Sequence, residues 1–130
     1  CELHGWDLSL SDAVARLHED VFLHEAPFPE GASGRFDRIF LIELLEHVSE
    51  PYELLAQCAQ ALRPGGRIVL TTATNIPQFD HVINFPADHA QFRERVEMLG
   101  LGIVSEEDIP HRWVASHIDS RNRFFVLERP

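Results

Sequence analysis

The sequence predicts an α/β protein whose strands form a doubly wound, mostly parallel sheet. Short apolar runs alternate with segments of helical periodicity along most of the 130 residues. Such runs are typical of strands buried on both faces of a parallel sheet, and the alternation implies right-handed crossovers. The length fits one domain, residues 1–130, and no internal repeat or low-complexity tract divides it.

The predicted strands are runs of six to nine residues. A weaker strand opens the chain at residues 1–7, and the final strand covers residues 122–130 after the segment 102–110. The stronger runs between them are Val21–Ala26, Phe36–Ile42 and Gly66–Ala73.

Three helices are predicted between these strands, over Ser9–Asp20, about residues 49–62 and about Asp88–Leu99. Ser9 and Asp12 stand three apart in a capping-box pattern at the start of the first helix. The second helix is expected to have Ser49 as its N-cap and Pro51 in its first turn, and the letters RPGG are expected to stop it.

Charge and composition exclude several classes of function. Eleven basic against 21 acidic residues give a net charge of -10, which argues against broad contact with a nucleic-acid backbone. No apolar run is long enough to cross a membrane, so no membrane partner is expected. Two cysteines without metal-type spacing and a start without a signal-peptide pattern predict a cytoplasmic setting. Because the chain does not begin with Met, we expect it to be processed, trimmed or a fragment.

Ligands of doubly wound sheets bind beyond the carboxyl ends of the strands. Asp7 follows the first predicted strand, where an acid is placed to accept hydrogen bonds from ribose hydroxyls. The alternative, that Asp7 only caps the following helix, is equally compatible with its position. The residues that this geometry nominates are Asp7, Leu8, Glu25, Ala26, Leu41, Ile42, Glu43 and Thr72 to Asn75.

The ordered segments HGWDLS, FLHEAPFPEG and FDRIFLIELLEHVSEPYELLAQCAQALRPGGRIVLTT, followed by a helix and a strand, resemble the class I S-adenosylmethionine-dependent methyltransferases. The resemblance implies a Rossmann-like sheet with an antiparallel final strand and S-adenosyl-L-methionine as cofactor. It also implies that Asp7 binds the ribose, Leu8 packs on adenine, Glu25 and Ala26 flank the adenine ring, and Leu41, Ile42 and Glu43 run beside the methionine.

The sequence departs from that family at one point. The first strand of the family and its glycine-rich loop have no counterpart here, although the family sheet is usually ordered 3-2-1-4-5-7-6 with that strand at the centre. Its absence would leave two strand edges unpaired in the middle of the sheet. We therefore expect an N-terminally truncated domain that is completed by a missing N-terminal segment or by a second chain, and that binds the cofactor poorly alone.

The run IELLEHV places Glu43, Glu46 and His47 at the spacing i, i+3, i+4. One interpretation is the ordinary turn of this family, with the polar side chains holding the loop or lining the cofactor pocket. The other is a divalent-metal site, because one helical turn would place two carboxylates and an imidazole on one face. A similar run forms the metal site of small-RNA 2′-O-methyltransferases and recurs in ubiquinone-biosynthesis O-methyltransferases. His81 and His89 are candidates for a further ligand.

Methyl transfer requires alignment of an acceptor and removal of its proton. His47 is the first candidate catalytic base, followed by His81 and His89, and Phe79 and Trp113 are either acceptor-pocket or core residues. The acidic charge favours a small-molecule acceptor. Two alternatives stay open: an inactive methyltransferase-like binding module, and a nicotinamide-dependent oxidoreductase, which would use Asp7 in the same way.

Overall fold

A computed structural model describes residues 2–11, 20–28, 33–76, 78–86, 89–110 and 121–130. The chain forms two compact units, residues 1–31 and 32–130. Within the described ranges, no helix combines the length and apolarity that a membrane span requires. The prediction of a single domain stays a prediction.

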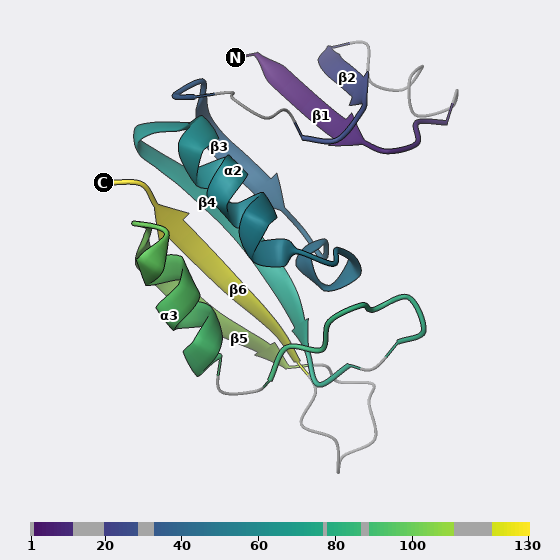
Figure 1. The fold of residues 1–130 in the computed structure, drawn as a ribbon, viewed down its shortest axis with the longest axis vertical. Helices are drawn as coiled ribbons and strands as arrows, with labels where there is room; N and C mark the ends of the chain where they lie inside the picture. The colour runs from purple at the N-terminus through teal and green to yellow at the C-terminus, as the bar shows by residue number, and fades with distance from the viewer. Residues whose placement is uncertain (1, 12–19, 29–32, 77, 87–88, 111–120) are drawn as a thin grey trace. The chain divides into compact units, whose positions relative to one another are not determined.

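The first unit contains a two-stranded parallel sheet (Figure 1). Strand β1 (Leu3–Asp7) pairs with β2 (Val21–Glu25), from Leu3 opposite Val21 to Asp7 opposite Glu25. Both strands were predicted, whereas most of the predicted first helix falls on residues 12–19, outside the described residues. Parallel pairing brings the carboxyl ends of both strands to one edge, where the backbone N–H of Ala26 donates to the carbonyl of Asp7 at 2.9 Å.

Aromatic and imidazole rings stabilise one face of this small sheet. His24 stacks on Trp6 with ring centroids 4.6 Å apart, and His4 stacks on Phe22 at 5.0 Å. The two imidazoles also share a hydrogen bond between Nδ1 of His4 and Nε2 of His24, 3.0 Å apart. Cross-strand pairs of this kind are the main side-chain contribution to the stability of a sheet.

The second unit is built on a four-stranded sheet in the order β3-β4-β6-β5. Strand β3 (Phe36–Leu41) is parallel to β4 (Leu62–Thr74), and β6 (Arg121–Glu128) is antiparallel to both β4 and β5 (Gly102–Pro110). The expected antiparallel final strand is therefore confirmed, and the order reproduces the 4-5-7-6 half of the expected sheet.

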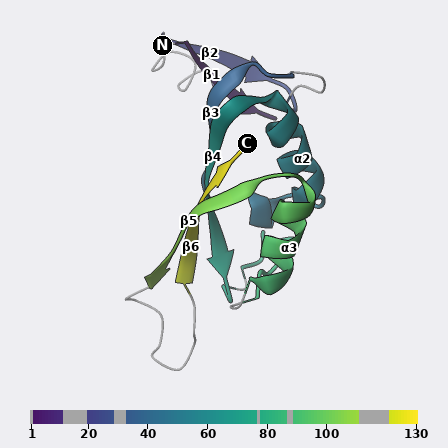
Figure 2. The ribbon, with the colours of Figure 1, turned by 90° about the vertical axis from the view of Figure 1, so that its left-hand side faces the viewer.

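Helices α2 (Pro51–Ala61) and α3 (Ala90–Met98) cover the same face of the four-stranded sheet (Figures 1 and 2). Between sheet and helices lie Leu55, Ile68, Leu70, Phe92, Val96, Phe125 and Leu127, each at most 2% exposed. Cys58 on α2 belongs to this core as well, and burial raises the pKa of its thiol to about 12. The thiol is therefore neutral and serves packing rather than nucleophilic chemistry.

The start of α2 corrects one prediction. Its N-cap is Glu50, not Ser49, and no side chain caps the helix. Pro51 occupies the first turn, as predicted, and it disfavours helical backbone at the residue before it. Glu50 accordingly adopts φ -125° and ψ 68°, so the helix begins at the proline itself.

The RPGG segment stops α2 as predicted, but β4 begins four residues earlier than expected. Strand β4 pairs with β3 from its first residue, with Leu62 opposite Phe36. The register then shifts, so that Arg67 lies opposite Arg38. Gly65 takes φ 73° in the intervening turn. The segment is therefore an irregularity inside β4 rather than a connection before it.

The described strands form two separate sheets, and no ladder joins β1 to β3. Among the described residues, β1 pairs only with β2, and β3 pairs only with β4. These open edges match the place at which the family resemblance puts a further strand.

Candidate functional site

The polar residues of the second unit gather where β3 and β4 end. The backbone N–H of Glu43 donates to Oγ1 of Thr71 at 3.0 Å, and that of Ala73 donates to Oε1 of Glu46 at 3.3 Å. Thr71 and Ala73 are two apart on β4 and point to the same side. The end of β4 thus anchors the 3-10 helix η1 (Leu45–His47) and the turn before it.

Glu43 lies in that turn and not in a helix. Its φ of 49° is left-handed, and its N–H bonds to Thr71 rather than to a helical carbonyl. The helical turn expected to place Glu43, Glu46 and His47 on one face is therefore not formed, because the chain bends at Glu43 before η1 begins. Oε1 of Glu43 is buried and has no hydrogen-bond partner among the described residues.

Glu46 is fully buried although it carries a carboxyl group. Its backbone carbonyl accepts hydrogen bonds from the N–H groups of Val82 and Ile83, at 2.8 and 3.1 Å. Burial raises the pKa of the carboxyl group, and the neighbouring carboxylate of Glu43 raises it further. Within the described part of the chain, Oε2 of Glu46 has no partner.

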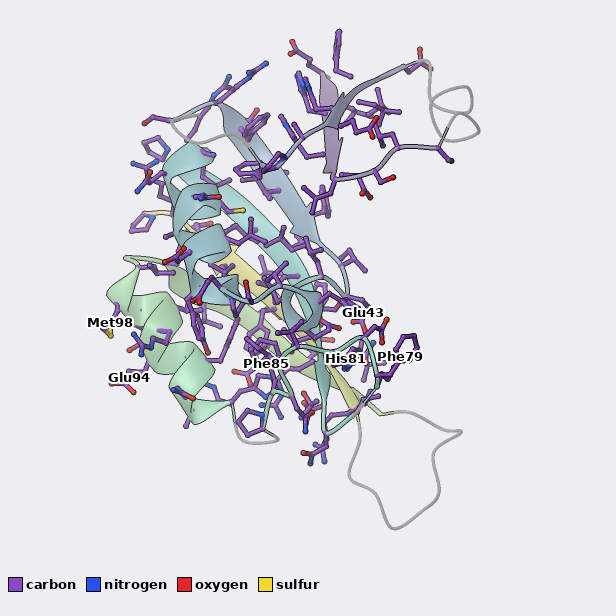
Figure 3. The ribbon with its side chains drawn as sticks, turned by 45° about the vertical axis from the view of Figure 1, so that its right-hand side comes forward. Glu43, Phe79, His81, Phe85, Glu94 and Met98 are labelled. Carbon is purple, nitrogen blue, oxygen red and sulfur yellow. The ribbon has the colours of Figure 1, made fainter. Side chains whose placement is uncertain are left out.

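His47 and His81 bring two imidazoles beside this carboxyl group. Their ring centroids are 4.9 Å apart and their planes nearly perpendicular, at 82°. Nδ1 of His47 lies 3.1 Å from the carbonyl of Asp80, and since a carbonyl oxygen only accepts, Nδ1 is the donor of this hydrogen bond. Figure 3 shows Glu43, Phe79 and His81 at the same end of the unit. Ligand atoms of Glu46, His47 and His81 all lie within 4.8 Å of one another, and Glu43 is not in this group.

His89 has a different role. It is fully buried, its Nε2 lies 3.0 Å from Oγ1 of Thr72 and 3.4 Å from Oγ1 of Thr74, and its ring stacks on Phe85. These contacts tie the start of α3 to the opposite side of β4. Of the two histidines nominated as further ligands, the structure therefore brings His81, not His89, to Glu46 and His47.

The remaining nominated residues lie at strand ends, as expected. Oδ1 of Asp7 accepts the backbone N–H of Ser9 at 3.0 Å, so one carboxylate oxygen holds a local turn. Leu8 is 75% exposed, and Glu25 and Ala26 are exposed at the same edge. In the second unit Leu41 is buried in the core and Ile42 is exposed.

Asp80 is a site residue that the sequence did not single out. Besides its carbonyl, its carboxylate Oδ2 lies 3.7 Å from Nδ1 of His47. The only sequence signal was its position next to His81 in the loop after β4, and a loop residue gives no indication of which earlier turn it contacts.

The sequence of the chain matches a known protein family. Residues 1–116 match the family described as "Methyltransferase domain", and the chain therefore belongs to that family. It is 42% identical over 77 residues to a ubiquinone biosynthesis O-methyltransferase of Aromatoleum aromaticum, covering 52% of this chain and 33% of that protein. It is 32% identical over 101 residues to the 27-O-demethylrifamycin SV methyltransferase of Amycolatopsis mediterranei, covering 78% of this chain and 33% of that protein. The chain thus spans about a third of these relatives.

Solved structures confirm the fold. The Burkholderia thailandensis 1,6-didemethyltoxoflavin-N1-methyltransferase, solved with 1,6-didemethyltoxoflavin and S-adenosylhomocysteine, has a TM-score of 0.71 at 17% identity, over 97% of this chain and 60% of that chain. The [4+2]-cyclase SpnF has a TM-score of 0.73 at 15% identity, over 99% of this chain and 66% of that chain. The predicted Rossmann-like sheet of the class I methyltransferase type is therefore correct.

Proposed function

We propose that this chain is part of a methyltransferase that transfers a methyl group from S-adenosyl-L-methionine to a small molecule. The observation that carries the proposal is the family match over residues 1–116. The names of the two curated relatives, both methyltransferases of small organic molecules, support the acceptor class. The fold alone would not, because it also occurs in a cyclase.

The proposed cofactor contacts are the residues nominated at the strand ends. Asp7 retains Oδ2 for a ribose hydroxyl while Oδ1 holds the turn to Ser9, and the exposed side chain of Leu8 is available to pack on adenine. Glu25 and Ala26 would flank the adenine ring. The turn from Leu41 through Ile42 to Glu43 would run beside the methionine part. Because the side chain of Leu41 is buried in the core, this residue would contribute its backbone groups.

The chemistry requires little beyond alignment and proton removal, since the sulfonium is already activated. Because Nδ1 of His47 donates to the Asp80 carbonyl, Nε2 is the nitrogen that would accept a proton from an acceptor hydroxyl or amine when the imidazole is neutral. His81 stands beside it as a second base.

Isothermal titration with S-adenosylhomocysteine and with NAD tests the cofactor, and it uses a protein that also contains the further strand and glycine-rich turn proposed below. We expect heat only from S-adenosylhomocysteine, and at least a tenfold loss of affinity, about 1.4 kcal/mol, in Asp7→Ala. Asp37→Ala is the matched control, since its exposed carboxylate pairs with Arg63 at the start of β3. Binding of NAD, or equal affinity in Asp7→Ala and wild type, would contradict the assignment. Folded protein that contains the further strand and still has no affinity for either ligand would favour the inactive module.

A divalent cation is a second candidate component, favoured by the group formed by Glu46, His47 and His81. The donor set fits such an ion: Oε2 of Glu46 and Nδ1 of His81 are buried and have no partner in the described residues. The carbonyl of Asp80 orients the ring of His47, as outer groups do at metal sites. Such an ion would polarise an acceptor hydroxyl and lower its pKa. This would resemble the metal-assisted small-RNA 2′-O-methyltransferases.

Titration of chelator-treated protein with Zn²⁺, Mn²⁺ and Mg²⁺ tests this component. We expect 1:1 binding that His81→Ala and Glu46→Gln abolish and His89→Ala leaves intact. If all three variants bind alike, or wild type binds none of the ions, the metal has no place in this site.

The open edges of β1 and β3 support one proposal about partners. We propose that a further strand with a glycine-rich turn, from the same polypeptide or from a second chain, pairs there and completes the cofactor site. Hydrogen exchange provides the test: the backbone amides of β3 that face away from β4 exchange fast in this chain and slowly in a protein in which the further strand is present. We also propose a cytoplasmic location, which fractionation of cells producing the native protein would check.

A further inference from the structure

Phe79 is the most exposed large apolar side chain in the described residues, with a relative exposure of 103%. It lies in a tight turn in which the backbone N–H of His81 donates to the carbonyl of Gln78 at 3.2 Å. Val82, one residue past His81, is 61% exposed. Two exposed apolar side chains three residues apart in one turn are therefore a candidate contact surface for a ligand.

The turn that carries Phe79 is attached to the polar cluster by several hydrogen bonds. Val82 and Ile83 donate their N–H groups to the carbonyl of Glu46, and the carbonyl of Asp80 contacts Nδ1 of His47. Phe79 immediately precedes Asp80, so its backbone is held beside the two imidazoles. Ile42 and Leu44, at 57% and 40% exposure, add apolar surface in the segment that contains Glu43.

The charge of this cluster is one-sided. It contains the carboxyl groups of Glu43, Glu46 and Asp80, and the sequence contains no lysine. In the described part of the chain, every arginine salt bridge goes to a carboxylate outside the cluster: Asp37, Glu106, Asp108 or Glu128. In the absence of a metal ion, an anionic ligand would therefore meet like charge, and no salt bridge of the described residues brings an arginine to this cluster.

We propose that Phe79 and Val82 form the platform on which the methyl acceptor packs, and that the acceptor is an uncharged or cationic molecule with a flat apolar ring. This inference rests on the proposed function and names its substrate class. The ring packs on Phe79, because aromatic faces pair in offset-stacked or edge-to-face contacts. The polar substituent of the ring then faces the imidazole of His81, which lies between Phe79 and Val82 in the sequence, and that of His47, whose ring centroid is 4.9 Å from that of His81.

Saturation-transfer NMR with four probes tests both parts of the proposal, in buffer with chelator at about pH 7. Benzyl alcohol, benzylamine and benzoate share a ring and differ in charge, and cyclohexylmethanol replaces the flat ring of benzyl alcohol with a saturated one. We expect benzyl alcohol and benzylamine to bind wild type about three- to tenfold more tightly than either benzoate or cyclohexylmethanol.

Four variants separate the platform from the rest of the protein. Phe79→Ala reduces the affinity for benzyl alcohol by about three- to tenfold, and Phe79→Trp retains it. Met98→Ala is the matched control, since Met98 is 71% exposed on α3, on the other side of the unit (Figure 3). Glu43→Gln narrows the difference between benzylamine and benzoate. Equal binding of all probes, or loss of affinity in Met98→Ala to the same extent as in Phe79→Ala, overturns the proposal.

The affinity for S-adenosylhomocysteine keeps this test distinct from that of the proposed function. If a protein that also contains the further strand binds the ring probes in the expected order but not S-adenosylhomocysteine, the platform stands and the proposed cofactor falls. If it binds S-adenosylhomocysteine and does not discriminate among the probes, the cofactor stands and the platform falls.

Discussion

The backbone N–H of Ala73 donates a hydrogen bond to Oε1 of Glu46, and 3.3 Å separates the two atoms. This bond explains why a carboxyl group follows so soon after a buried strand. The end of β4 presents a backbone donor that no neighbouring strand satisfies on that side, and the side chain of Glu46 satisfies it. Glu46 therefore has a structural function even before any ligand is considered.

Replacing Glu46 separates that structural function from its charge. In Glu46→Leu the N–H of Ala73 loses its acceptor while remaining buried, and we expect a loss of about 1–3 kcal/mol in the free energy of unfolding. Glu46→Gln keeps a carbonyl oxygen of the same reach and should fold at least as stably as wild type at neutral pH. Urea unfolding of the three proteins measures both effects. A Gln variant as unstable as the Leu variant would show that the charge, not the hydrogen bond, holds η1.

The pH dependence of wild type relative to Glu46→Gln has a definite sign. The pKa of Glu46 is raised above its ordinary 4.5 in the folded state, mainly by burial. The folded protein therefore binds this proton more tightly than the unfolded chain, and the contribution to stability is fully present below 4.5. It is lost as the pH rises through the folded pKa. The difference between the two proteins should accordingly shift in favour of Glu46→Gln as the pH rises above 4.5, and a constant difference would contradict it.

The regular elements were predictable from sequence because they follow from periodicity. Val21–Ala26 and Phe36–Ile42 were expected as strands, and the observed strands end one residue earlier in each case. Local sequence patterns did not predict the conformation of segments that depend on contacts between residues far apart in the chain. The left-handed backbone at Glu43 depends on its bond to Thr71, 28 residues away, which no helical spacing rule includes.

The same limit applies to the histidines. His81 and His89 are equivalent as letters in a polar loop, yet one lies at His47 and the other is buried against Thr72. Only the register of the loop against β4 distinguishes them. The residue types of the site were thus predictable, and their grouping was not.

Glu106 should show the opposite pH dependence to Glu46. Arg93 donates two hydrogen bonds to its carboxylate, at 2.6 and 2.8 Å, and Arg123 adds a third at 2.8 Å. Bonding to Arg93 holds the pKa of Glu106 below its ordinary 4.5, so its contribution is complete above 4.5 and is lost as the pH falls. Charge-assisted bonds of this kind contribute about 1.5–3 kcal/mol, which Glu106→Gln should remove near neutral pH. The variant and wild type should converge in acid, and Glu107→Gln on the same strand serves as control.

Phe92 is buried and Phe79 is exposed, so the same substitution at both positions gives a matched comparison. Phe92 is 2% exposed and its ring centroid lies 4.7 Å from that of Phe125. Phe92→Ala should lower the free energy of unfolding by about 3–5 kcal/mol, because it leaves a cavity between α3 and the sheet. Phe79→Ala should change it by less than about 0.5 kcal/mol. Chemical denaturation measures both, and a large effect of Phe79→Ala would mean that Phe79 stabilises the fold instead of contacting a ligand.

The two glycines of RPGG should respond differently to alanine, because different physical constraints require each of them. Gly65 adopts φ 73° with open space around it, so an added methyl group meets only the backbone strain of the left-handed region, about 1–2 kcal/mol. Gly66 has no such φ, but a Cβ there would lie 2.8 Å from the carbonyl oxygen of Arg63 and 3.0 Å from the side chain of Leu62. Since a backbone carbonyl inside β4 cannot move without disturbing the pairing of the strand, we expect Gly66→Ala to be the more damaging change. Gly102→Ala, where the nearest atom is 3.9 Å away, should stay within about 0.5 kcal/mol of wild type. Thermal unfolding of the three variants tests the ranking, and a greater loss in Gly65→Ala than in Gly66→Ala would show that the strand adjusts to the added methyl group more easily than the turn tolerates its strain.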